Sequence, residues 1–104
     1  MNRQKIIYAV SGAAIILIFV LSLVQTASTG GEIYEREGCG KCHNFKGHGG
    51  ALAPDLTSVT QRRSTIWIMN QIKNPKSHNP DSRMPVFDHL SIVERFAISQ
   101  YLKG

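Results

Sequence analysis

The feature that most constrains this chain is the segment Cys39-Gly40-Lys41-Cys42-His43, which contains both of its cysteines. Two cysteines separated by two residues and followed directly by a histidine form the attachment motif of a c-type haem. Each thiol can add across one vinyl group of the porphyrin, and the short spacer lets both sulfurs reach the same edge of one macrocycle. The pattern therefore predicts one covalent haem c bound by Cys39 and Cys42, with His43 as an iron ligand.

Three other interpretations of the cysteine pair are weaker. A structural zinc site could add His43 and His48 as ligands, but the second pair of ligands usual for such sites is absent. A thioredoxin-like redox pair normally opens a helix in a βαβ pattern, and no strand pattern precedes Cys39. A disulfide would close a very small loop and restrict the unfolded chain little. Haem attachment is favoured over all three.

An uncharged run of nineteen residues, Ile6 to Val24, lies near the N-terminus. As a helix it would be about 28 Å long, close to the ~30 Å thickness of the hydrocarbon core of a bilayer. Arg3 and Lys5 precede it, and the next cation is Arg36. The positive-inside rule then leaves residues 1–5 in the cytoplasm and exports everything after the run. We predict a transmembrane anchor over residues 6–24.

A cleaved signal peptide is the alternative, but its apolar core is normally shorter, and Thr26-Ala27-Ser28 is a poor cleavage site. Residues 25–30 are expected to form a short polar tether, which reaches only about 20 Å when fully extended. The haem domain, residues 31–104, would then lie at the membrane surface. This predicts a single-pass protein of the bacterial inner membrane with a periplasmic haem domain and a redox partner in or on the same membrane.

Composition limits what the exported part can be. A domain of this size buries a modest apolar area and often needs a disulfide, a metal or a cofactor to be stable. A haem would be such a cofactor. The whole chain has a net charge of +5. From Gly31 onward, ten Lys and Arg oppose seven Asp and Glu, which leaves +3. These charges form no basic stripe, which argues against a nucleic-acid partner.

Three helices are expected in the exported part. Thr29 and Glu32 have the spacing of a capping box and predict a helix over about 30–37. A helix over 66–73 is predicted after the capping residues Ser64 and Thr65. The capping box of Ser91 and Glu94 predicts another that runs to about residue 103. Residues 44–63 show no periodicity, and we expect them to wrap a haem edge. Because no segment alternates with period two, the fold class is predicted to be all-α.

Met84 is the candidate for the second iron ligand. It follows a turn signal at residues 79–82, and Pro85 restricts its backbone to extended conformations. A thioether on a stiff loop can be aimed at a metal. His78 or His89 on the same loop would give a bis-histidine alternative, but neither is fixed by a proline in this way.

The assembled residues resemble a class I c-type cytochrome, and the similarity covers Gly31 to Leu102. Its marks appear in the family's order: Gly31 and Tyr34, Gly38 and the attachment motif, Ala53-Pro54-Asp55-Leu56, Trp67 before Pro75, Arg83-Met84-Pro85, and Tyr101 and Leu102. The resemblance implies a small all-α domain around one haem, with His43 as the proximal and Met84 as the distal ligand. It also implies that the first and last helices cross at Gly31.

The same resemblance implies further haem contacts. The carbonyl of Pro54 would accept the second ring N–H of His43 and so fix the ring and raise its basicity. Arg62, Arg63 and Trp67 are similar in position to groups that bind haem propionates in related bacterial cytochromes.

A six-coordinate iron has no open position, so we expect outer-sphere transfer of single electrons, no enzymatic activity and no small-molecule substrate. Lys41 and Lys46 would present positive charge near the haem edge to an acidic partner. One alternative is a fixed haem subunit of a respiratory complex, because residues 53–63 are similar to the anchored cytochrome subunit of bacterial nitric oxide reductases. Another is a haem sensor or peroxidase-like protein in which Met84 leaves easily.

Overall fold

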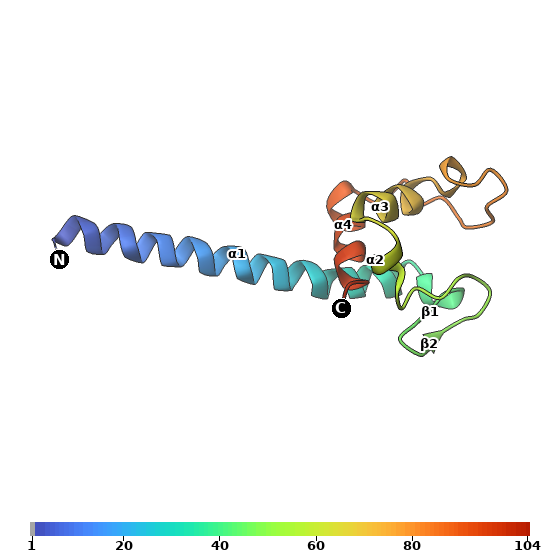
Figure 1. Cartoon of the computed structure of the whole chain (residues 1–104), viewed down its shortest axis with the longest axis horizontal. Helices are drawn as coiled ribbons and strands as arrows, with labels where there is room; N and C mark the ends of the chain where they lie inside the picture. The colour runs from blue at the N-terminus through green and yellow to red at the C-terminus, as the bar shows by residue number, and fades with distance from the viewer. Residues whose placement is uncertain (1) are drawn as a thin grey trace.

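The computed structural model describes residues 2–104, with the backbone only for residues 23–28. A long helix projects from a small domain, and the molecule measures 65 × 28 × 24 Å (Figure 1). The elements in chain order are α1 (Arg3–Arg36), η1 (Cys39–Lys41), β1 (Asn44–Phe45), β2 (His48–Gly49), α2 (Val59–Arg62), α3 (Thr65–Lys73), η2 (Pro75–Ser77) and α4 (Ile92–Tyr101).

Helix α1 is one unbroken element of 34 residues. Its Arg3–Ser22 part is long and apolar enough to cross a membrane, and its side chains are not buried in the domain. A helix this apolar all round needs lipid or protein around it. The sequence predicts a separate tether over residues 25–30 and a helix start at Thr29. The structure corrects both expectations, because the backbone of these residues is helical and α1 begins at Arg3, directly after the cap residue Asn2.

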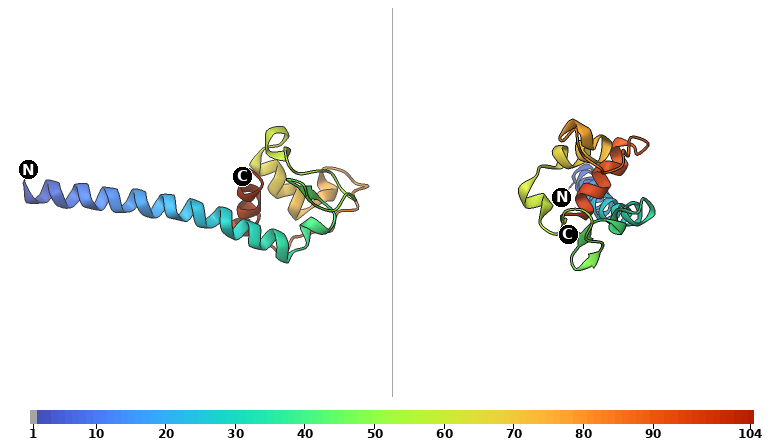
Figure 2. Two further views of the ribbon diagram at one scale, coloured as in Figure 1. Left: turned by 90° about the horizontal axis from the view of Figure 1, so that it is seen from below. Right: turned by 90° about the vertical axis from the view of Figure 1, so that its right-hand side faces the viewer.

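Helix α4 crosses α1 near the C-terminal end of α1 (Figure 2), and two glycines of α1 allow the close approach. A Cβ on Gly30 would lie 2.5 Å from the carbonyl carbon of Ala97, and one on Gly31 would lie 3.1 Å from the ring of Tyr101. The expected crossing at Gly31 is therefore found, with the tightest backbone approach one residue earlier. Tertiary packing explains why these glycines do not end the helix.

Helices α3 and α4 start where their serines predict. Ser64 Oγ accepts from the backbone N–H of Trp67 at 3.1 Å. Ser91 and Glu94 form a complete capping box at α4, and Glu94 also accepts from Arg36 of α1 at 2.9 Å. The buried hydrophobic side chains come from both helices, from α1 and from the segments between them: Ile33, Tyr34, Phe45, Val59, Ile68, Ile72, Leu90, Ala97, Ile98 and Leu102.

Residues 44–63 contain more regular structure than expected. Strands β1 and β2 pair antiparallel, with Asn44 opposite Gly49. The two residues between the strands, Lys46 and Gly47, have positive φ angles of 52° and 83°, as a tight hairpin turn requires. The short helix α2 closes the segment. The domain is mostly helical, and its two-residue strands are too short to leave an alternating pattern in the sequence.

Candidate haem site

The attachment motif lies on one tight turn directly after α1. Gly38 ends the helix in the left-handed conformation, with φ 74°, which glycine adopts without steric strain. The backbone N–H of His43 then donates to Cys39 O at 3.0 Å. Both thiols are free, with Cys39 half-buried and Cys42 exposed. The turn thus carries two thiols and an imidazole within five consecutive residues.

The glycine-rich segment after the motif packs directly on the motif's backbone. Gly50 N donates to Gly40 O at 2.9 Å, and Ala53 N donates to Cys42 O at 3.0 Å. A Cβ on Gly50 would lie 2.9 Å from the carbonyl carbon of Lys41. The glycine is therefore needed for this close approach, and the segment holds the shape of the attachment turn.

The ring of His43 is oriented by one strong contact. Its Nδ1 lies 2.7 Å from the carbonyl oxygen of Pro54. A carbonyl can only accept, so Nδ1 carries a proton, and in the neutral ring Nε2 then has the lone pair. An Nε2 lone pair on a ring fixed through Nδ1 is the usual arrangement of a metal-ligating histidine.

The environment of the cysteines disfavours the other chemistries of such a pair. Burial raises the pKa of the Cys39 thiol to about 11, and the Glu37 carboxylate contributes in the same direction. A redox-active cysteine pair needs a lowered pKa. Within residues 2–104, apart from the side chains of 23–28, no three His, Cys, Asp or Glu side chains gather as a metal site requires.

Met84 lies on a loop that several contacts fix. Its backbone N–H donates to Ser82 Oγ at 3.3 Å, and Phe87 N on the same loop donates to Ile72 O of α3 at 3.1 Å. The half-buried sulfur of Met84 accepts from Gln71 Nε2 at 3.7 Å. In Figures 1 and 2 the loop between η2 and α4 and the segment from η1 to α2 lie at the end of the domain remote from the N-terminus.

The candidate propionate-binding residues lie next to these segments. Arg62 Nη2 donates to Asp55 O at 3.4 Å. The guanidinium of Arg63 lies 4.3 Å from the centre of the Trp67 ring. That ring stacks on His78 with 4.3 Å between centroids and 4° between planes. Both arginines are exposed and Trp67 is half-buried. Their role toward a haem remains a prediction.

The two histidines of the bis-histidine alternative have other partners. His78 Nδ1 lies 2.7 Å from Gln71 Oε1, and His89 Nε2 lies 3.0 Å from Glu37 Oε2. The sulfur of Met84 is held only by a weak contact, since a thioether is a poor acceptor. Met84 as the second iron ligand stays a prediction.

The sequence alone did not point to Gln71, whose side chain contacts both Met84 and His78. Gln71 lies four residues after Trp67, so both side chains are on the same face of α3. That spacing was the one indication in the sequence that Gln71 lies near the candidate site.

A comparison with known protein families identifies the family of this chain. The sequence profile of the cytochrome c family matches residues 27–104, three quarters of the chain and including the whole attachment motif. The chain belongs to the cytochrome c family. No curated protein matches the chain. Family membership confirms the expected fold, a mostly helical domain after an apolar helix. It also implies haem-based electron transfer, and the paired cysteines are consistent with a covalent haem c.

The residues of this cytochrome c domain fit a haem. Two free thiols, one imidazole with a free Nε2 and one thioether form the donor set. Apolar side chains near these donors in the sequence remain open to solvent: Leu52 is 87% exposed and Val86 48% exposed. A large apolar ring is the kind of group that would cover such side chains.

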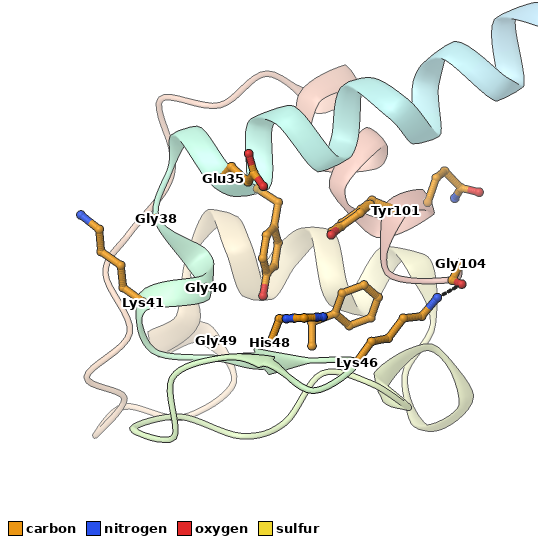
Figure 3. A pocket seen from close by; sticks show the side chains of 12 residues that line it. Glu35, Gly38, Gly40, Lys41, Lys46, His48, Gly49, Tyr101 and Gly104 are labelled. Carbon is orange, nitrogen blue, oxygen red and sulfur yellow. Dashed lines mark hydrogen bonds between the residues drawn. The ribbon is translucent and has the colours of Figure 1, made fainter.

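An open pocket of about 730 Å³ lies beside the attachment turn (Figure 3). Tyr101 and Lys46 line it, together with Tyr34, whose buried hydroxyl has no hydrogen-bond partner within the described part of the chain. Burial raises the pKa of Tyr34 to about 12. Gly40 and Lys41 of the attachment motif also line this pocket, whereas Cys39, Cys42, His43 and Met84 do not.

Proposed function

We propose that this chain is a membrane-anchored, monohaem cytochrome c that carries single electrons, with its iron held between His43 and Met84. The observation that carries this proposal is the 2.7 Å contact between His43 Nδ1 and Pro54 O, which leaves Nε2 as the free donor of the ring. When bound, the haem iron supplies reversible one-electron exchange. His43 and Met84 would hold the iron and leave it no place for a substrate, so the protein would act as an electron carrier and not as an enzyme.

The remaining residues bind and orient. Arg62, Arg63 and Trp67 are proposed to bind the haem propionates. Lys41 and Lys46 are exposed and would attract an acidic redox partner toward the attachment turn. Because exposed charges are screened by salt, association with that partner should slow as ionic strength rises.

We also propose that the Arg3–Ser22 part of α1 is a retained anchor, with the N-terminus in the cytoplasm and the haem domain on the outer side of the bacterial inner membrane. The continuity of α1 supports retention, because cleavage after residues 26–28 would cut inside the helix. Mass analysis of the mature protein tests this proposal. A polypeptide that lacks the first 26 to 28 residues would contradict it.

The ligand set is tested on the holoprotein. The intact mass should include one haem, and the ferric protein should show the near-infrared sulfur-to-iron band. Met84→Ala should abolish that band. Met69→Ala is the matched control, because Met69 is also half-buried but lies on α3, and it should keep the band. If the unmodified protein lacks the band, methionine ligation is wrong and a haem sensor or peroxidase-like function is favoured.

A second candidate is a fixed haem subunit of a membrane oxidoreductase, of the respiratory or nitric oxide reductase-like kind. The unbroken α1 favours it, because only residues 23–29 separate the apolar part from the crossing with α4. As helix these residues span about 11 Å, so the domain would be held near the membrane at a set rotation. Mild detergent extraction followed by sizing separates the two candidates. A fixed subunit migrates with a large oxidoreductase, and a tethered carrier migrates alone.

Helical phase gives a sharper test of a fixed orientation. Two alanines inserted within residues 23–28 would rotate the domain by about 200°, whereas seven would return it to within about 20° of its original direction. A fixed subunit should lose co-purification with the two-residue insertion and keep it with the seven-residue insertion. Equal tolerance of both insertions would favour the tethered carrier.

A further inference from the structure

One side of α4 is exposed and apolar. Ile92 is 68% exposed and Val93 is 71% exposed. Phe96 follows them by four and three residues and is half-buried. Residues at this spacing lie on one side of a helix. Single exposed apolar side chains are ordinary on a protein surface, whereas a group of them is typical of a surface that binds another molecule. We call Ile92, Val93 and Phe96 the outer face of α4.

The packing of the other sides of α4 fixes the direction of this outer face. The carbonyl of Ala97 and the Cβ of Tyr101 lie against α1. Ile98 and Leu102 are buried in the core. At 100° per residue, the outer face lies opposite these two core residues. Figures 1 and 2 show the rest of the domain on the side of α4 away from the N-terminal part of α1. The outer face is therefore turned toward that part of α1.

The length of α1 places the outer face at the level of lipid headgroups. Helix α4 lies across α1 (Figure 1), and residues 23–29, which span about 11 Å as helix, separate the crossing from the apolar part. Side chains extend about 5–6 Å from a helix axis, so the outer face comes within about 5 Å of the level at which the apolar part ends. The headgroup region is about 5–8 Å thick on each side of a bilayer. With the Arg3–Ser22 part of α1 in the membrane, the outer face reaches into this region.

The charges of α4 suit a negatively charged lipid surface. Lys103 lies two residues past the end of α4 and is exposed. Cations beside an apolar face are typical of helices that lie in a lipid interface. Glu94 is the only acid in the sequence of α4, and it accepts from Arg36 of α1 at 2.9 Å. The outer face itself therefore carries no negative charge.

We propose that α4 is an interfacial helix whose outer face binds the phospholipid surface of the membrane that α1 spans. This inference rests on the proposed function, because it takes α1 as a retained anchor. The lipid contact gives the domain a second attachment and so fixes its rotation about α1. The attachment turn and the Met84 loop lie at the opposite end of the domain (Figures 1 and 2). A redox partner then reaches the candidate haem site from the aqueous side.

The test uses the full-length holoprotein in nanodiscs of phosphatidylethanolamine and phosphatidylglycerol, with one protein per disc. Single cysteines are introduced by Val93→Cys on the outer face and, as the control, by Asp81→Cys on the exposed loop at the opposite end. The haem occupies both native cysteines of the holoprotein. An uncharged, water-soluble maleimide labels the introduced thiol, and mass spectrometry gives the rate. Rates measured in the unfolded protein correct for the intrinsic reactivity of each thiol.

We expect Val93→Cys to react about tenfold more slowly than Asp81→Cys, the factor for burying a side chain of this size. Equal rates at the two positions would overturn the proposal. Fast labelling of Val93→Cys in nanodiscs together with slow labelling in native membranes would also overturn it, and would assign the outer face to a protein partner. A mature protein that lacks its first 26 to 28 residues by mass would instead refute the anchor, so the two failures are distinguishable.

Discussion

Replacing Gly30 by alanine tests whether α1 and α4 cross through their backbones. The new Cβ would lie 2.5 Å from the carbonyl carbon of Ala97 and 3.0 Å from Tyr101 Cβ. Non-bonded carbons prefer a separation of about 3.5–4.0 Å, so the helices must move apart by about 1 Å. The obstructing atoms near Ala97 are backbone atoms, which cannot rotate away as a flexible side chain could.

The expected loss of stability combines two opposing effects. Overpacking of a tight contact costs about 1–3 kcal/mol, and this site belongs at the upper end because backbone meets backbone. The change from glycine to alanine in a helix returns about 1 kcal/mol. The free energy of unfolding should therefore fall by about 2 kcal/mol, which lowers the melting temperature of a domain this size by about 8–16 °C.

Thermal unfolding of the holoprotein, followed by circular dichroism and Soret absorbance, measures this change. Gly12→Ala is the matched control, because a Cβ there meets nothing within 4 Å, and it should leave the melting temperature of the domain unchanged. If Gly30→Ala were as stable as the unmodified protein, the helices would not cross at this residue. The same result would also mean that packing against α4 does not explain why α1 continues through its two glycines.

Three further predictions concern charge, burial and the attachment turn. The backbone N–H of Ser91 and the side chain of Arg36 lower the pKa of Glu94 below its ordinary 4.5. The stability they supply should be complete above pH 4.5 and decline as pH falls through the lowered pKa, and Glu94→Gln should flatten this decline in denaturant titrations. Burial raises the pKa of Tyr34 from 10.0 to about 12, so stability should fall as pH rises from 10 toward 12. Tyr34→Phe should remove that fall and, by deleting an unpartnered buried hydroxyl, add about 1 kcal/mol at neutral pH; a less stable variant at pH 7 would show that the hydroxyl has a partner. Gly50→Ala should displace the segment that packs on the attachment turn and lower the yield of haem-loaded protein, measured as the Soret-to-protein absorbance ratio, and an unchanged ratio would contradict that role.

The parts of the fold that follow from local chemistry could be predicted from the sequence. The capping box at Ser91 and Glu94 fixed the start of α4, and Ser64 fixed the start of α3. Local chemistry misled at Thr29, where a capping pattern and two glycines suggested a break. There the decisive contact is with α4, more than sixty residues later in the chain, and no local pattern reveals it.

The candidate site divides in the same way. The attachment residues lie within five positions, so their spacing alone predicts them. The sulfur of Met84 contacts Gln71, thirteen residues earlier on α3, and Gln71 in turn contacts His78. A glutamine and a histidine are ordinary surface residues in a sequence, and only the fold shows that they contact each other next to Met84.

The continuity of α1 links anchoring to electron transfer. The same helix whose apolar part is proposed to be the anchor supplies Gly30 for the crossing with α4 and ends at Arg36, shortly before the attachment turn. The helix has no extended hinge between its apolar part and the crossing with α4. A kink or break in residues 23–28 should therefore change where the haem edge faces without changing the haem site itself. Partner recognition would then depend on the backbone of α1 as well as on the surface charges of the domain.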